Sequence, residues 1–223
     1  MFSTFAYYVL GLYTKGEINM LFKVKSLFKR HFQDNFIFYS LLAITFVLGI
    51  LIGSIIANRL DKTKSIELAN YMNVFLKHIN HGKYSFKDVF LSSLFINYKV
   101  IFLIWIFGLM GIGLIIIPII MCWNGINIGF LVGFLVKNYG LKGFMFSLMA
   151  LLPQYLIILP SLLIVTAIAL SNSVNMKKNK KRRYLNKNIA DYSMSVLVFS
   201  LLIVLGCIIE GFYTQYFVKF IMI

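Results

Sequence analysis

The stretch VIFLIWIFGLMGIGLIIIPIIMCWNGINIGFLVGFLV, residues 100–136, decides the fold because it holds no charged residue. A straight helix through it would be about 55 Å long, nearly twice the roughly 30 Å hydrocarbon core of a bilayer. The chain must therefore turn within this stretch. The expected turn is Cys122-Trp123-Asn124-Gly125, where an interfacial tryptophan and an Asn-Gly pair interrupt the apolar run. The stretch thus predicts two spans, 100–121 and 125–139.

Three further apolar segments are long enough to cross a membrane, namely 36–57, 143–170 and 192–217. The segment 143–170 contains Pro153 and Pro160, and we expect one long span that its prolines kink. The sequence therefore predicts an all-α fold, a polytopic membrane helix bundle with about five transmembrane helices. All of them belong to a single membrane domain, residues 36–217.

The polar connection 58–99 is predicted to form an amphipathic helical hairpin between the first two spans. Apolar residues recur at helical spacing in its first half, at Leu68, Met72, Phe75, Leu76 and Ile79. Gly82 breaks this pattern, and a second helix is expected over 86–98. The hairpin would lie on the bilayer or cap the bundle, and the sequence does not choose between the two.

Residues 1–35 are the expected N-terminal segment. A basic amphipathic helix is predicted over 20–32, where apolar residues recur at helical spacing and lysines fill the other face. Met20, followed by Leu-Phe-Lys, resembles a translation start, so the sequence leaves open whether residues 1–19 are translated.

The composition is 60% apolar and 13% charged, with a formal net charge of +15. A soluble domain averages roughly 45–50% apolar and about 25% charged residues. This difference excludes an ordinary globular domain and a disordered protein. The positive charge rests on too few residues for a nucleic-acid-binding protein, so the expected partner is membrane lipid rather than nucleic acid.

Basic residues predict the orientation in the membrane. The loop 171–191 holds the densest basic run, which includes Lys177, Lys178, Lys180, Lys181, Arg182 and Arg183. The positive-inside rule places this loop and the basic N-terminal helix in the cytoplasm. Four spans between them satisfy both placements. Five spans then leave the N-terminus in the cytoplasm, with the hairpin 58–99 and the C-terminus outside.

Small residues predict close helix packing. Gly49 and Gly53 form a GxxxG pair in the first span, and Gly125, Gly129 and Gly133 line one face of the third. Glycine lets helix backbones approach closely in lipid, where no hydrophobic effect draws helices together. Two interpretations stay open, packing within the bundle and docking of a partner's transmembrane helix. The oligomeric state is not decided, and a homo-oligomer remains an alternative.

The sequence offers no set of residues for catalysis, cofactor binding or metal binding, so we do not expect an enzyme. His78 and His81 lack further ligands at metal-binding spacing. Glu210 is the one acid inside a predicted span and is expected near the outer interface in a structural role, although intramembrane acids are candidates for ion or proton sites. Gln154 beside Pro153 is expected to bond to the backbone groups that the proline frees.

Several short motifs, in their order and spacing, resemble the stage II sporulation protein M family of endospore-forming Firmicutes. They are YMNVF at 71–75, GKYSF at 82–86, LIWIFG at 103–108, NIGFLVGF at 127–134, GLKG at 140–143, and the proline motifs at Pro153-Gln154 and Leu159-Pro160. The wider superfamily often carries a Pro-His-Gly element with a following glutamate near the fourth span. Here Pro153-Gln154-Tyr155 takes that place with no acid nearby in the sequence, so a role that needs those groups is not transferable.

The resemblance implies a non-enzymatic membrane scaffold in the mother cell during engulfment of the forespore. Such a scaffold would recruit two enzymes that cut peptidoglycan outside the membrane, stage II sporulation proteins D and P. A small membrane permease or transporter subunit is the alternative.

Overall fold

The computed structural model describes residues 35–80, 85–178 and 185–221, and these ranges form five helices. They are α3 (Phe36–Asn58), α4 (Lys62–Asn80), α5 (Phe86–Leu109), α6 (Gly113–Lys178) and α7 (Leu185–Ile221). All of them except α4 are long and apolar enough to cross a membrane. The predicted helical membrane bundle is thus confirmed. The basic amphipathic helix expected over 20–32 lies outside the described residues.

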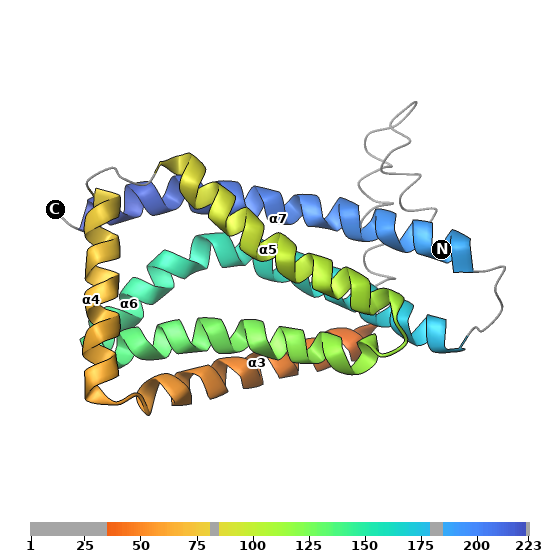
Figure 1. Ribbon diagram of the computed structural model, residues 1–223, viewed down its shortest axis with the longest axis horizontal. Helices are drawn as coiled ribbons and strands as arrows, with labels where there is room; N and C mark the ends of the chain where they lie inside the picture. Colours follow the sequence, from red (N-terminus) through yellow and green to blue (C-terminus); the bar gives the residue numbers. More distant parts are fainter. Residues whose placement is uncertain (1–34, 81–84, 179–184, 222–223) are drawn as a thin grey trace.

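Helix α6 is two antiparallel arms that meet at Gly140 (Figure 1). Gly140 has φ 57° and ψ −136°, a conformation that L residues with a side chain rarely adopt. The arms, 113–139 and 141–178, are about 40 Å and about 57 Å long at the usual helical rise. Each is long enough to cross a bilayer, so α3, α5, α7 and the two arms provide five membrane-length segments.

Helix α4 runs across one end of the bundle, at a steep angle to the other helices (Figure 1). Asp61 caps its N-terminus, because the Lys62 backbone N–H donates a hydrogen bond to Asp61 Oδ1 at 2.8 Å. The last turn of α3, the first turn of α5 and the Gly140 bend lie at this end, which we call the α4 end (Figure 1). The start of α3, the end of α6 and the start of α7 lie at the opposite end.

Helix α5 corrects the expectation of a surface hairpin over 58–99. The predicted surface helix 86–98 and the beginning of the second span form one continuous helix, Phe86–Leu109. A capping box starts it, in which the Ser85 backbone N–H donates to Asp88 Oδ2 at 2.8 Å and the Ser85 side chain accepts from the Asp88 backbone. Of the two expected surface helices, α4 alone stays separate from the spans.

The turn between the second and third spans lies at 110–112, not at Cys122–Gly125. Met110 is extended and ends α5. Two side chains of the second arm of α6 donate to carbonyls there: Asn172 Nδ2 donates to Gly108 O at 2.9 Å, and Ser173 Oγ donates to Met110 O at 2.7 Å, beside the Gly113 backbone N–H, which donates to the same Met110 oxygen at 3.0 Å. Hydrogen-bond donors from a distant part of the sequence therefore stabilise a turn within an apolar run.

The segment Cys122–Gly125 is helical within the first arm of α6. The Asn124 side-chain amide donates to Ile120 O, one turn earlier, at 2.9 Å. The asparagine thus bonds to its own helix and does not make a turn. Two further helix ends differ from the prediction, because α6 extends to Lys178 and α7 begins at Leu185. Much of the expected loop 171–191 is therefore helical.

Candidate functional site

The two glycine sets lie against each other along α3 and the first arm of α6. A Cβ atom built on Gly49 would lie 3.1 Å from Gly125 Cα and closer still to the Cys122 carbonyl oxygen. One built on Gly129 would lie 2.6 Å from Ile50 Cα, and one on Gly133 would lie 2.8 Å from Ser54 Cα. The backbones of the two helices are therefore in direct contact. We call this contact of Gly49, Gly53, Gly125, Gly129 and Gly133 the glycine seam.

The glycine seam is occupied within the chain. Real Cβ atoms essentially never come closer than 3.0 Å to other heavy atoms, so each of these positions requires glycine while the two helices remain together. This contact between α3 and the first arm of α6 agrees with the first interpretation, in which the glycines pack helices within the bundle. Docking of a partner's helix on these same glycines would require α3 to separate from α6.

Hydrogen bonds join α5, α7 and the second arm of α6 on the other side of the molecule. Tyr192 Oη donates to Trp105 O at 3.1 Å, and Trp105 Nε1 donates to Ser193 Oγ at 3.0 Å. The Tyr98 and Ser200 hydroxyls lie 3.5 Å apart. These side chains come from α5 and α7. We call them, together with Asn172 and Ser173, the polar seam.

Glu210 of α7 lies next to two polar side chains of α5. The Ser93 hydroxyl donates a hydrogen bond to the Glu210 carboxylate. Asn97 Nδ2 in turn donates to Ser93 O at 2.9 Å and lies 3.7 Å from Cys207 Sγ. Because the first turns of α5 lie at the α4 end, Glu210 lies near that end of the bundle (Figure 1). Its partners, more than a hundred residues earlier in the chain, carried no sequence signal.

The proline motif lies in the second arm of α6, which bends along its length (Figure 1). Pro153 and Pro160 are both within this arm. The side chain of Gln154 is only 8% exposed and makes no hydrogen bond with any described residue. The expected bond from Gln154 to the freed backbone is therefore not formed.

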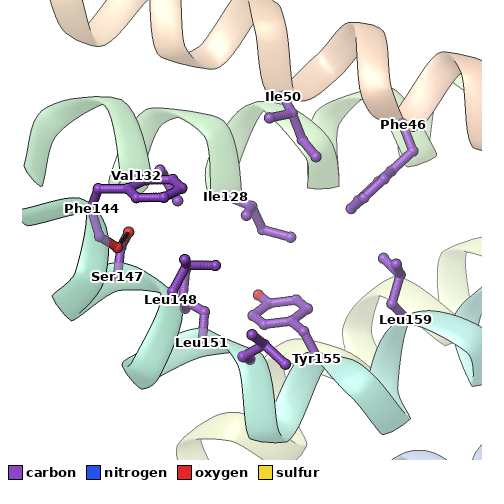
Figure 2. Close-up of a pocket in the computed structure, with 11 residues that line it drawn as sticks. Phe46, Ile50, Ile128, Val132, Phe144, Ser147, Leu148, Leu151, Tyr155 and Leu159 are labelled. Atoms are coloured by element: carbon purple, nitrogen blue, oxygen red, sulfur yellow. Dashed lines mark hydrogen bonds between the residues drawn. The ribbon is translucent and has the colours of Figure 1, made fainter. Parts of the chain in front are cut away.

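A pocket of about 190 Å³ lies between α3 and the two arms of α6. Figure 2 shows the Tyr155 ring projecting into it toward Ile128, with Phe46 and Ile50 of α3 on the far side. Ser147 also lines it, but its hydroxyl donates back to Phe144 O at 2.8 Å. The lining is otherwise apolar, so the pocket suits an apolar group rather than a hydrated solute.

Helix α4 presents apolar side chains away from the bundle. Ser65 faces inward and donates a hydrogen bond to Asn138 Oδ1 of α6 at 2.9 Å. On the outward face, Ile66 is 62% exposed, Tyr71 66% and Val74 51%. This outward face was not predicted from the sequence. We call Ile66, Tyr71 and Val74 the α4 platform.

Two of the basic residues that the sequence used for orientation lie at the end opposite α4. Lys177 and Lys178 are the last two residues of α6. Lys180, Lys181, Arg182 and Arg183 lie outside the described residues. No group of three or more His, Cys, Asp or Glu side chains assembles among the residues that the structure describes.

Comparison with known proteins gives one family. The model of the family described as stage II sporulation protein M matches residues 42–215, from within α3 to within α7. No curated protein and no solved structure matches the chain.

Proposed function

The chain belongs to the stage II sporulation protein M family, as the order of its motifs predicted, and we propose that it is a non-enzymatic scaffold for engulfment of the forespore. Family membership and the membrane-length helices make it a sporulation-related membrane protein. In this proposal it recruits and anchors peptidoglycan-degrading partners, stage II sporulation proteins D and P, in the mother-cell membrane. The observation that carries the proposal is the α4 platform.

The α4 platform has the properties of a docking surface. It is held at one end of the bundle by the bond between Ser65 and Asn138 and by contact between α4 and α7. Large apolar side chains on an exposed surface are typical of protein or membrane interaction sites. An aromatic side chain such as that of Tyr71 is typical of the centre of such interfaces.

The proposed orientation puts the α4 platform outside the cell. The positive-inside rule assigns the cytoplasm to the end where Lys177 and Lys178 complete α6. The α4 end then faces the peptidoglycan. With five membrane-length segments, α3 begins in the cytoplasm and α7 ends outside. Partners that cut peptidoglycan would meet the platform on the side where their substrate lies.

The test is co-purification of the two hydrolases with the full-length protein from membranes. Replacing Ile66→Asp and Val74→Asp together puts two carboxylates on the platform and leaves the inward contacts of α4 in place. We expect at least about a tenfold loss of recovered hydrolase, the size seen when central interface residues are lost. Unchanged recovery of both hydrolases would remove the platform from the proposal.

The matched control is Lys62→Asp. It introduces the same carboxylate at an exposed residue of α4, at the N-terminus of the helix, where negative charge is favourable. We expect it to retain both hydrolases. An equal loss with Lys62→Asp would indicate a general charge effect rather than the platform.

A further inference from the structure

The pocket between α3 and the two arms of α6 is long and narrow. Its lining residues on the second arm of α6 begin at Phe144 and end at Leu159. Figure 2 shows these two residues at opposite ends of the pocket. The helix between them is about 22 Å long at the usual rise, or about four turns. The pocket volume of about 190 Å³ is therefore spread along several turns of helix.

The pocket is open along one edge. Phe144, Leu148 and Leu152 line it at intervals of about one helical turn, and they are 40%, 38% and 49% exposed. On the opposite wall, Phe46 of α3 is buried and Ile50 is half-buried. A molecule beside the bundle can therefore enter the pocket from the side.

The medium at this open edge is the hydrocarbon of the bilayer. Phe46 and Ile50 lie near the middle of the candidate span Phe36–Asn58. Among the described residues, no charged side chain lines the pocket, and the Ser147 hydroxyl is bonded within its own helix. At this depth the molecules around a membrane protein are the acyl chains of lipids.

An empty pocket of this kind is unfavourable. Protein interiors are close-packed, and the atoms that line a void lose dispersion contacts. Water is a poor occupant, because an apolar cavity of about 150 Å³ in a soluble protein stays dry and takes up benzene instead. The occupant of the pocket must therefore be apolar.

The shape of the pocket distinguishes among apolar occupants. An α-helix is about 10–12 Å across, so a helix of this length would need on the order of 2,000 Å³. The pocket is too small for a helix of a partner or of a second copy of the chain. A compact ligand such as benzene would contact only part of its length. An extended hydrocarbon chain fits both the length and the width.

We propose that the pocket binds one acyl chain of a membrane phospholipid between α3 and the two arms of α6. The chain enters from the leaflet at the α4 end, because Phe144 lies only about one turn beyond the bend at Gly140. The glycine seam joins α3 to the first arm, and the chain fills the remaining space between α3 and the second arm. The lipid is thus a structural part of the bundle. The scaffold proposal does not depend on it.

The experiment is photolabelling of the full-length protein in phosphatidylglycerol vesicles. The vesicles contain a trace of phosphatidylglycerol with a diazirine in the middle of one acyl chain, and mass spectrometry of peptides locates the adducts. Tyr155 projects into the pocket, whereas Ile104 is 0% exposed and does not line it. We expect at least about tenfold more label on Tyr155 than on Ile104, because an adduct requires direct contact with the chain.

A variant that fills the pocket should exclude the chain. Ile128→Trp places an indole ring in the space toward which Tyr155 projects (Figure 2). The label on Tyr155 should fall at least about tenfold, because a well-packed site has no room for both groups. Ile119→Trp is the same change in the same arm at a residue that is 60% exposed, and it should leave the label unchanged. Leu156, 64% exposed, reports contact with bulk lipid and should be labelled equally in all three proteins.

Two results would overturn the proposal. Label on Tyr155 no higher than on Ile104 in the wild type would show that no chain enters and that a protein segment fills the pocket instead. Equal label on Tyr155 in the wild type and in Ile128→Trp would show contact with bulk lipid only. If Ile128→Trp does not fold, Val132→Phe, which enlarges another lining residue of the same arm, replaces it. Recovery of the hydrolases is a separate measurement, which tests the scaffold.

Discussion

The glycine seam and the polar seam hold helices together in two different ways. In the glycine seam, α3 and the first arm of α6 touch through their backbones, as Gly129 does against Ile50. In the polar seam, hydroxyl and indole groups bond across α5 and α7, as Tyr192 does to Trp105. In lipid, close packing and interhelical hydrogen bonds replace the hydrophobic effect between helices. The glycine seam relies on close packing, whereas the polar seam adds hydrogen bonds to close contacts such as that of Gly206 with Ile158.

The two mechanisms differ in how they fail. A glycine contact is lost when any side chain is added, because backbone atoms cannot move aside. A hydrogen bond can be lost one at a time, while the surrounding apolar contacts remain. We therefore expect one substitution in the glycine seam to cause a large loss of stability. Each substitution in the polar seam should cause only a small one.

The largest effect is expected for Gly129→Leu. The new side chain would collide with the Ile50 backbone and separate α3 from α6. Overpacking against backbone should cost about 3 kcal/mol or more of the free energy of unfolding. The measurement is the midpoint of thermal unfolding of the purified protein in detergent. Asn127→Leu adds the same side chain at an exposed position of the same arm and should shift the midpoint little. Similar midpoints for the two variants would mean that α3 and the first arm of α6 are not in contact at the glycine seam.

A smaller effect is expected for Tyr192→Phe in the polar seam. The change removes the hydroxyl that donates to Trp105 O and leaves the ring in place. Interhelical hydrogen bonds of this kind contribute about 1 kcal/mol. Tyr139→Phe is the matched control, because the Tyr139 side chain is 46% exposed. A decrease in the free energy of unfolding as large as that of Gly129→Leu would contradict the expected difference between the two seams.

The smallest effect is expected for Lys137→Met, at the α4 end of the glycine seam. Lys137 Nζ donates to the carbonyl of Asn58, the last residue of α3, at 2.9 Å and to Leu60 O, just beyond the helix, at 2.7 Å. A cation at a helix C-terminus contributes about 0.5 kcal/mol when exposed. Lys142→Met removes the same charge at an exposed residue just beyond Gly140. Equal unfolding midpoints for the two variants would show that the glycine contacts alone hold α3 against the first arm of α6, without a contribution from Lys137.

Periodicity accounts for what the sequence could predict. The spacing of Gly125, Gly129 and Gly133 identifies one helix face, and the uncharged runs identify membrane-length segments. Neither pattern identifies the helix that packs against a given face. That Gly125 meets Gly49, and not a second protein, depends on three-dimensional packing that a single sequence does not display.

The sequence failed where distant residues supply the missing bonds. The turn at Met110 has no local polar signal, because Ser173 donates to it from another helix. Asn124 gave a local signal for a turn, yet its side chain bonds within its own helix. Glu210 appeared isolated for the same reason, since Ser93 joins it only in the folded bundle. Local patterns could not predict these contacts.

The bend at Gly140 has a consequence for biogenesis. The two arms of α6 meet there without a connecting loop, so only the six residues 137–142, which include two lysines, separate their apolar runs during synthesis. A translocation channel therefore receives two apolar stretches in close succession, which together are too long for a single crossing. The first arm has no exported domain to hold it in place until the second arm emerges. The pair must enter the bilayer as a helical hairpin, and α3 can complete its seam only after that insertion.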